Sequence, residues 1–290
     1  MNDHIVALKP HQWIKNLFIF LPLVFGKKLF ILPVIIRTGA GFFLFCLASS
    51  AAYLINDVID AQKDAAHPMK RSRPVASGKV KKAEALCIAF VLGLVSCAGA
   101  FTLSTKFGWV LVFYLVFNVV YSKLLKEEVI VDVFCIGFFF IARIMAGSFL
   151  SDVAPSYWVI LMTFLLALFL GFNKRRQELL MLEERAVAHR LVLSHYNEYF
   201  IDVMTAIIAS SIVVLYMFYA IDARTVGVFG TWHLVYTIPF VYYGMFRYLY
   251  LIHKHNHNGD PTHILLSDGK MQANLLLWVF MCIAVIYYGL

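Results

Sequence analysis

Apolar runs of membrane length occupy most of this chain. Of its 290 residues, 61% are hydrophobic and only 14% are charged, and the mean hydropathy is +0.77. A soluble domain of this size has no use for so much apolar surface, whereas an integral membrane protein needs it. A spanning helix requires roughly 20 apolar residues. The sequence therefore predicts an all-α integral membrane protein with nine transmembrane helices, near residues 14–34, 38–57, 83–103, 107–123, 129–149, 155–174, 200–220, 230–252 and 270–289.

The first of these segments is the least regular. Lys27, Lys28 and Pro33 interrupt it, so a spanning helix and a short helix followed by a re-entrant bend both remain open. No small-residue cleavage site follows, and a removable signal peptide is not expected. No stretch has the composition of a soluble domain or a linker. Residues 1–290 are therefore predicted to form a single polytopic membrane domain.

The positive charges predict how the chain is oriented. If the N-terminus is cytoplasmic, 19 of the 25 Lys and Arg residues lie on or beside the inner segments, and one, Arg143, lies within a span. Such a bias follows the positive-inside rule and predicts a multi-pass protein of the cell inner membrane. The inner loops 57–82, 122–128, 174–199 and 253–269 would then form the site face, around a cytoplasm-facing polar cavity. The opposite face carries five cations: Lys27, Lys28, Arg37, Lys106 and Arg224.

A group of oxygen-bearing side chains follows the second apolar run. Asn56, Asp60 and Asp64 are four residues apart and share one face of a helix, and Asp57 lies close to that face. Carboxylates beside lipid are costly unless they are paired, hydrated or bound to a metal. Hard oxygen ligands suit Mg²⁺, which is commonly held by a few carboxylates together with substrate phosphates. These four residues are therefore the predicted metal ligands of an enzyme that acts on a diphosphate.

Cations follow the acids closely in the sequence. Lys70, Arg71 and Arg73 precede a Pro and a Gly that favour a turn. One interpretation is a diphosphate cradle, in which the metal binds phosphate oxygens and these cations neutralise the remaining charge. The other is an ordinary positive-inside loop balanced by its acids. The second does not explain the spacing of Asn56, Asp60 and Asp64, so we favour the first.

The next inner turn carries Tyr121 and Lys126, and Asp132 follows just inside the fifth span. Arg143 returns to nearly the same helical face as Asp132, but the two lie roughly 16 Å apart along the axis and cannot pair directly. A charged residue inside a membrane is a functional candidate. Tyr121, Lys126, Asp132 and Arg143 are therefore predicted to bind substrate. For Arg143, a structural role with bonds to helix carbonyls stays open.

The sixth span ends in a basic stretch. Lys174 and Glu178 share a helical face, and Arg175 lies beside them. A membrane anchor would explain the cations, but guanidinium groups also match phosphate oxygens bidentately. The last inner loop carries His253, His255, His257 and His263 in an Asn- and Gly-rich turn, and their role stays open. No segment has the pattern of a nucleic-acid site, and no nucleic-acid partner is expected. A transporter would distribute its ionisable residues through the spans, which is not the pattern here.

Taken together, these residues resemble the UbiA superfamily of intramembrane prenyltransferases. The decisive element is Asn56-Asp57-x-x-Asp60-x-x-x-Asp64, which is similar to that family's first Asp-rich motif and is followed by Arg73-Pro74. The resemblance implies a UbiA-like bundle of nine helices. It also implies that the motif binds the donor's diphosphate through Mg²⁺.

One branch of the superfamily is more similar than the rest. Four blocks look like the decaprenyl-phosphate phosphoribosyltransferases: Lys9-Pro10-x-Gln12-Trp13-x-Lys15-Asn16, His67-Pro68-x-Lys70-Arg71-x-Arg73-Pro74, Lys174-Arg175-Arg176-x-Glu178-Leu179 and Leu265-Leu266-x-Asp268. Ordinary prenyltransferases of the superfamily carry a second Asp-rich motif after the sixth span. Here that position holds three cations and a single acid, Glu178. A donor with one diphosphate and a separate monophosphate needs one metal cluster and additional cations.

The resemblance implies transfer of 5-phosphoribose from phosphoribosyl diphosphate to a polyprenyl phosphate, with release of diphosphate. Its alternative is prenyl transfer from a polyprenyl diphosphate to an aromatic acceptor. The predicted catalytic residues are Asp57, Asp60, Asp64, Lys174 and Glu178. The predicted substrate-binding residues are Lys15, Asn16, Lys70, Arg71, Arg73, Tyr121, Lys126, Asp132, Arg143 and Arg175. The sequence leaves open the polyprenyl length and whether the enzyme works as a homo-oligomer.

Overall fold

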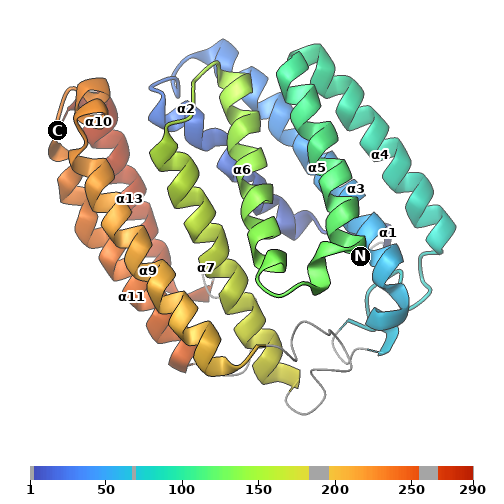
Figure 1. Ribbon diagram of the computed structural model, residues 1–290. Coiled ribbons are helices and arrows are strands. Elements are labelled where there is room, and N and C mark those ends of the chain that lie inside the picture. The colour runs from blue at the N-terminus through green and yellow to red at the C-terminus, as the bar shows by residue number, and fades with distance from the viewer. Residues whose placement is uncertain (1–2, 67–69, 183–195, 255–266, 290) are drawn as a thin grey trace. The chain divides into compact units, whose positions relative to one another are not determined.

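Helices make up the regular structure of the chain in the computed structural model, which describes residues 3–66, 70–182, 196–254 and 267–289. The prediction of an all-α protein is confirmed for these ranges. The chain divides into two compact units, Met1–Pro155 and Ser156–Leu290. Each unit is a bundle of helices (Figure 1).

The first unit is built around one long helix, α3, which extends over 35 residues. Helices α4, α5 and α6 pack against it, and the 3₁₀ helix η1 lies against both α3 and α6. The elements in order are α1 (Asp3–Ala7), η1 (Pro10–Phe20), α2 (Leu21–Phe25), α3 (Leu32–Ala66), α4 (Lys82–Leu103), α5 (Thr105–Lys123), η2 (Leu125–Glu127) and α6 (Val131–Ser151).

Small side chains let these helices approach one another closely. Ala48, Ala51 and Ala52 of α3 are buried, and such residues allow backbones to come together in membrane bundles. The closest approach is between η1 and α6 at Gly147. A Cβ atom at that position would lie 1.9 Å from the carbonyl oxygen of Ile19. Only glycine therefore fits there without moving η1.

The second unit begins with α7 (Tyr157–Leu182), which packs against α9 (Glu198–Ile221). Side chains cap the starts of its helices: Asn197 accepts from the amide of Phe200 at 2.7 Å, Asp222 from that of Thr225 at 3.2 Å, and Asp268 from that of Met271 at 2.8 Å. Its remaining elements are α10 (Ala223–Phe229), η5 (His233–Thr237), α11 (Ile238–Lys254) and α13 (Gly269–Tyr288).

Seven helices in the described ranges are long and apolar enough to cross a membrane, against the nine spans predicted. The other two segments contain shorter helices. Residues 14–34 include the end of η1, α2 and a turn at Gly26–Lys27, while residues 230–252 contain η5 and most of α11. Lys27 and Lys28 at the turn after α2 explain the first interruption, because charge is costly in lipid.

Two helices continue beyond their predicted ends. Helix α3 extends to Ala66 and α7 to Leu182, so both the Asp57–Asp64 motif and the Lys174–Glu178 stretch are helical and do not lie in loops. The predicted inner loops 57–82 and 174–199 therefore begin later in the chain than predicted, after Ala66 and after Leu182. Residues 183–195 of the second loop lie outside the described residues, as do His67, Pro68, His255, His257, His263, Leu265 and Leu266.

Candidate active site

The acidic motif forms the last turns of α3. Asp57 is 1% exposed and Asp64 is also buried, whereas Asp60 is partly exposed. The helical spacing predicted from the sequence is thus present. Asn56 is fixed by its neighbour on α5, because its Oδ1 accepts a hydrogen bond from Ser122 Oγ at 2.9 Å.

Each of the three carboxylates is paired with a cation from another part of the first unit. Arg73 Nη1 lies 2.7 Å from Asp64 Oδ2 and 3.3 Å from Asp57 Oδ1. Lys126 pairs with Asp60. Lys9 Nζ lies 2.7 Å from Asp57 Oδ1. Buried carboxylates of this kind are stable only when they are paired, and these pairs satisfy that condition.

Lys9 is the residue of this cluster that was not predicted. It stands between α1 and η1 with a left-handed backbone, φ 52° and ψ 56°. Burial lowers the pKa of its ammonium group, and the neighbouring carboxylate of Asp57 opposes that shift. The sequence contained one signal for Lys9, its place at the start of the Lys9-Pro10-x-Gln12-Trp13 block, but 48 residues separate it from Asp57.

Arg73 is held by a compact turn after α3. The amide of Arg73 donates to Lys70 O at 3.0 Å, and the amide of Val80 donates to Pro74 O at 3.0 Å. Val75 and Val80 are buried against apolar residues of α3 and α4. The turn is therefore anchored by its own apolar residues, and the guanidinium group points to the motif.

Lys126 lies on η2, next to a strained turn. Ile130 has a positive φ of 68°, which is unusual for a β-branched residue, and the amide of Val131 bonds to Val129 O across it at 2.7 Å. Strain of this kind persists only where the surrounding structure fixes the backbone. A second pair, Lys63 with Glu127, also fastens η2 to α3.

A Mg²⁺ ion fits the chemistry of this cluster. Its donors are carboxylate oxygens, which are the hard ligands that Mg²⁺ prefers. Asp57 Oδ2 is buried and has no hydrogen-bond partner among the residues that the structure describes, an arrangement that costs free energy unless something binds there. Within the described ranges, no three acidic, His or Cys side chains already converge as a metal centre. Binding therefore requires the present cation partners to move.

Arg143 and Asn16 belong to a separate internal network. Arg143 Nε donates to Asn16 Oδ1 at 2.8 Å, and its other nitrogens donate to Phe139 O at 2.7 Å and Tyr114 Oη at 3.2 Å. The guanidinium carbon lies about 5 Å from three aromatic rings, those of Phe45, Tyr114 and Phe140. The Nδ2 of Asn16 donates to Ser49 Oγ and Cys46 Sγ. These contacts favour the structural role for Arg143 that the sequence left open.

The other predicted site residues of the first unit differ in their burial and packing. Tyr121 packs edge-on against Phe139, with ring centroids 5.6 Å apart. Asp132 is fully buried in the first turn of α6. Lys15 and Lys70 are partly exposed and Arg71 is exposed. None of these positions by itself identifies a ligand.

In the second unit, the basic stretch of α7 contains two buried arginines, and both form ion pairs. Arg175 is 1% exposed and pairs with Glu178 one turn further along the helix. Arg176 was not among the predicted site residues; it bonds to Asp202 of α9 at 2.7 Å and also contacts Glu198. Lys174 is exposed. Arg176 therefore joins α7 to α9, while Arg175 and Glu178 form a local pair on α7.

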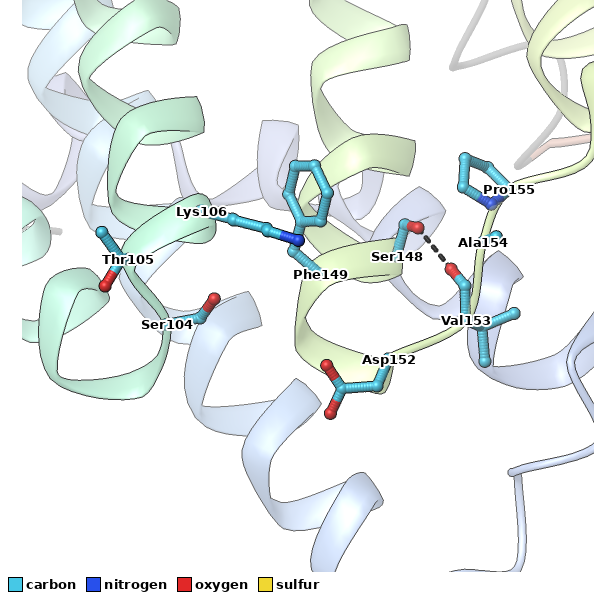
Figure 2. A pocket seen from close by; sticks show the side chains of 9 residues that line it. All are labelled: Ser104, Thr105, Lys106, Ser148, Phe149, Asp152, Val153, Ala154 and Pro155. Carbon is cyan, nitrogen blue, oxygen red and sulfur yellow. Dashed lines mark hydrogen bonds between the residues drawn. The ribbon is translucent and has the colours of Figure 1, made fainter.

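A cavity of about 610 Å³ lies in the first unit, between the start of α5 and the end of α6 (Figure 2). Its wall includes Asp152, which pairs at 2.8 Å with Arg37 near the start of α3. Arg37 and Asp64 are 27 residues apart on that helix, or about 40 Å. The cavity is therefore at the far end of the unit from the carboxylates. Its lining residues are Ser104, Thr105, Lys106, Ser148, Phe149, Asp152, Val153, Ala154 and Pro155.

The sequence matches the UbiA prenyltransferase family over residues 16–267. The chain belongs to this family. The resemblance inferred from the Asp motif is thus confirmed, and the protein is a multi-pass membrane-bound transferase. The match covers the carboxylates of α3 and the basic stretch of α7.

Among UbiA relatives of named function, a Mycobacterium tuberculosis protein called decaprenyl-phosphate phosphoribosyltransferase is 31% identical over 287 residues, covering 98% of this chain and 94% of that protein. A Corynebacterium glutamicum protein of the same name is 29% identical and covers 98% and 86%. Among solved structures, a UbiA homolog from Archaeoglobus fulgidus bound to GPP and Mg²⁺ superposes with a TM-score of 0.76 at 17% identity, covering 98% of this chain and 99% of that one. The superposition shows that the fold is the UbiA fold.

Proposed function

We propose that this protein transfers 5-phosphoribose from phosphoribosyl diphosphate to a polyprenyl phosphate and releases diphosphate. The observation that carries the proposal is the near full-length similarity to relatives named decaprenyl-phosphate phosphoribosyltransferase. The site supports it, because three carboxylates and three cations meet at one end of α3. A substrate rich in phosphate needs both a metal and several cations.

The carboxylates Asp57, Asp60 and Asp64 would hold Mg²⁺ on the leaving diphosphate, with Asn56 as a further oxygen donor. When bound, the ion neutralises negative charge on that group while the C1–O bond breaks. Asn56 would have to exchange its hydrogen bond with Ser122 for this role. Asp57 would use Oδ2, which has no hydrogen-bond partner within the described residues.

The cations would bind the phosphate groups. Arg73 offers a guanidinium fork and Lys126 a point charge, with Lys70 and Arg71 on the adjacent turn. The acceptor phosphate is already an anion, so the reaction needs no strong general base. Positioning and charge neutralisation would supply most of the rate. An in-line displacement would invert the configuration at the anomeric carbon.

In the second unit, Lys174 and Arg175 are the proposed partners of the donor's second phosphate. Glu178 would hold Arg175 in place, which is the pair observed on α7. From the sequence, we propose that Glu178 orients Lys174 or a metal-bound water; its observed partner is Arg175. Lys15, Tyr121 and Asp132 stay proposed substrate-binding residues.

The membrane topology extends the proposal. The two interrupted segments, with η1 and α2 in one and η5 and α11 in the other, would complete a nine-helix layout around a cytoplasm-facing polar cavity. The positive charges support a cytoplasmic N-terminus and site in the inner membrane. Labelling of single cysteines introduced at positions 70 and 106 from each side of the membrane tests this. Position 70 should react from the cytoplasmic side and position 106 from the opposite side. Any other result would contradict the proposed topology.

A donor test on detergent-purified protein with Mg²⁺ tests the reaction. One sample receives phosphoribosyl diphosphate and polyprenyl phosphate; the other receives polyprenyl diphosphate and 4-hydroxybenzoate. Mass spectrometry is expected to find a phosphoribosylated lipid in the first sample alone. A prenylated aromatic in the second would instead favour the alternative, prenyl transfer from a polyprenyl diphosphate to an aromatic acceptor.

A further inference from the structure

The acidic cluster of α3 is balanced in charge. Asp57, Asp60 and Asp64 carry three negative charges, and the cations that contact them, Lys9, Arg73 and Lys126, carry three positive ones. A bare divalent cation would therefore meet a site with no net negative charge. It would also be repelled by cations within a few ångströms, where the local dielectric constant is low. This arrangement disfavours the binding of a metal alone.

Lys9 is held in place by contacts of the residues on both sides of it. The carbonyl of Leu8 accepts a hydrogen bond from Ser50 Oγ at 2.9 Å, and Trp13 Nε1 donates to the same Oγ at 3.0 Å. Residues on both sides of Lys9 are thus tied to α3, two turns before Asp57. The ammonium group lies 5.4 Å from the centre of the Tyr53 ring. Its position at the motif is built into the fold and is not a chance surface contact.

A diphosphate changes this balance. It brings more negative charge than one Mg²⁺ ion removes, so the metal–diphosphate complex is an anion that three cations can receive. An ammonium group with three donors can turn from a carboxylate to a phosphate oxygen. That movement would remove the shorter of the two contacts to Asp57 Oδ1, leaving the one from Arg73 at 3.3 Å, at the moment when the metal needs ligands.

We propose that Lys9 is a diphosphate-binding residue that makes metal binding at Asp57, Asp60 and Asp64 conditional on the diphosphate. This inference rests on the proposed function and adds to it a residue and an order of binding. Without diphosphate, Lys9 occupies Asp57 Oδ1 and repels the metal. With diphosphate, Lys9 binds the phosphate and the carboxylates bind the metal.

Two affinities measured on the full-length, detergent-purified chain test this. The first is for Mn²⁺ alone, from the electron paramagnetic resonance signal of free Mn²⁺. The second is for ³²P-labelled inorganic diphosphate at saturating Mg²⁺, from equilibrium dialysis. In Lys9→Met, the affinity for Mn²⁺ alone is expected to rise about tenfold, while the affinity for diphosphate falls about tenfold. A merely structural role would move both affinities in the same direction.

Matched variants complete the test. Lys9→Arg keeps the charge and should leave both affinities near the wild-type values. Lys79→Met removes a lysine that pairs with Asp3 at 3.5 Å on the surface of the same unit, and should change neither. If Lys9→Met does not fold, Lys126→Met removes the partner of Asp60 from another segment and should give the same opposite shifts.

The outcomes separate the two proposals. If both affinities fall together in Lys9→Met, or if neither changes, the role of Lys9 is wrong. If the wild-type protein retains no diphosphate in the presence of Mg²⁺, the proposed metal–diphosphate site is wrong as well.

Discussion

The first unit contains two groups of buried charge that differ in their partners. Around Arg143, a single cation is surrounded by neutral oxygens and aromatic rings, and its hydrogen bonds are satisfied inside the bundle. Around Asp57, charges of both signs come from three separate segments, and one carboxylate oxygen has no partner in the described part of the chain. A charge within a membrane thus indicates function only when its partners can be exchanged for a ligand.

The largest effect is expected from Asp60→Asn, which removes one of the three carboxylates of the cluster around Asp57. The substitution keeps the shape of the side chain but removes the charge that a metal and Lys126 both need. Turnover in the donor assay should fall about 100- to 1000-fold, while size-exclusion chromatography still shows folded protein. Near-normal turnover would refute the metal assignment.

Replacement of Arg143 tests whether the network around this residue is purely structural. In Arg143→Met, Asn16 Oδ1 and Phe139 O lose a buried donor, and we expect a loss of about 2–4 kcal/mol in stability from unsatisfied groups. Thermal unfolding in detergent measures this. The KM for phosphoribosyl diphosphate in the surviving protein should stay unchanged. A raised KM with normal stability would return Arg143 to the substrate site.

Gly147→Ala tests whether the packing of η1 against α6 supports the carboxylate cluster around Asp57. The new methyl group would collide with Ile19 O, and overpacking of this kind costs about 1–3 kcal/mol. Lys9 immediately precedes η1 in the chain, so a shift of η1 would also displace Lys9. We therefore expect the substitution to weaken diphosphate retention together with stability. The matched control is Gly39→Ala on α3, where a Cβ atom meets nothing within 4 Å. Equal effects of the two substitutions would contradict the role of this close approach.

Arg175→Lys should have the smallest effect. Lysine keeps the charge but loses the planar fork that matches phosphate oxygens. We expect the KM for phosphoribosyl diphosphate to rise about tenfold, or about 1.4 kcal/mol, with the KM for the lipid acceptor unchanged. An unchanged donor KM would mean that Arg175 serves only its pair with Glu178.

The periodic features of this protein could be predicted from its sequence, and the pairings between distant segments could not. The spacing of Asn56, Asp60 and Asp64 predicted a shared helical face because helical geometry is local. One partner of Asp57, Lys9, lies 48 residues away, and one partner of Arg143, Asn16, lies 127 residues away, so neither follows from local spacing. Seven spans were predicted by their apolar length, whereas prolines and charges made the segments 14–34 and 230–252 ambiguous. The extension of α3 was missed because a polar helical end resembles a loop in composition.

The length of α3 determines where chemistry can occur. Thirty-five helical residues measure about 50 Å, whereas the hydrocarbon layer of a bilayer is ~30 Å thick. Roughly 20 Å of the helix must therefore be taken up by tilt or stand outside the oily layer, and its polar residues are concentrated in the last turns. Where the excess stands outside the oily layer, the carboxylates lie at the boundary between water and lipid. In the proposed reaction, a sugar phosphate dissolved in water and a phosphate carried on a membrane-bound chain would meet there, and neither would have to leave its own phase.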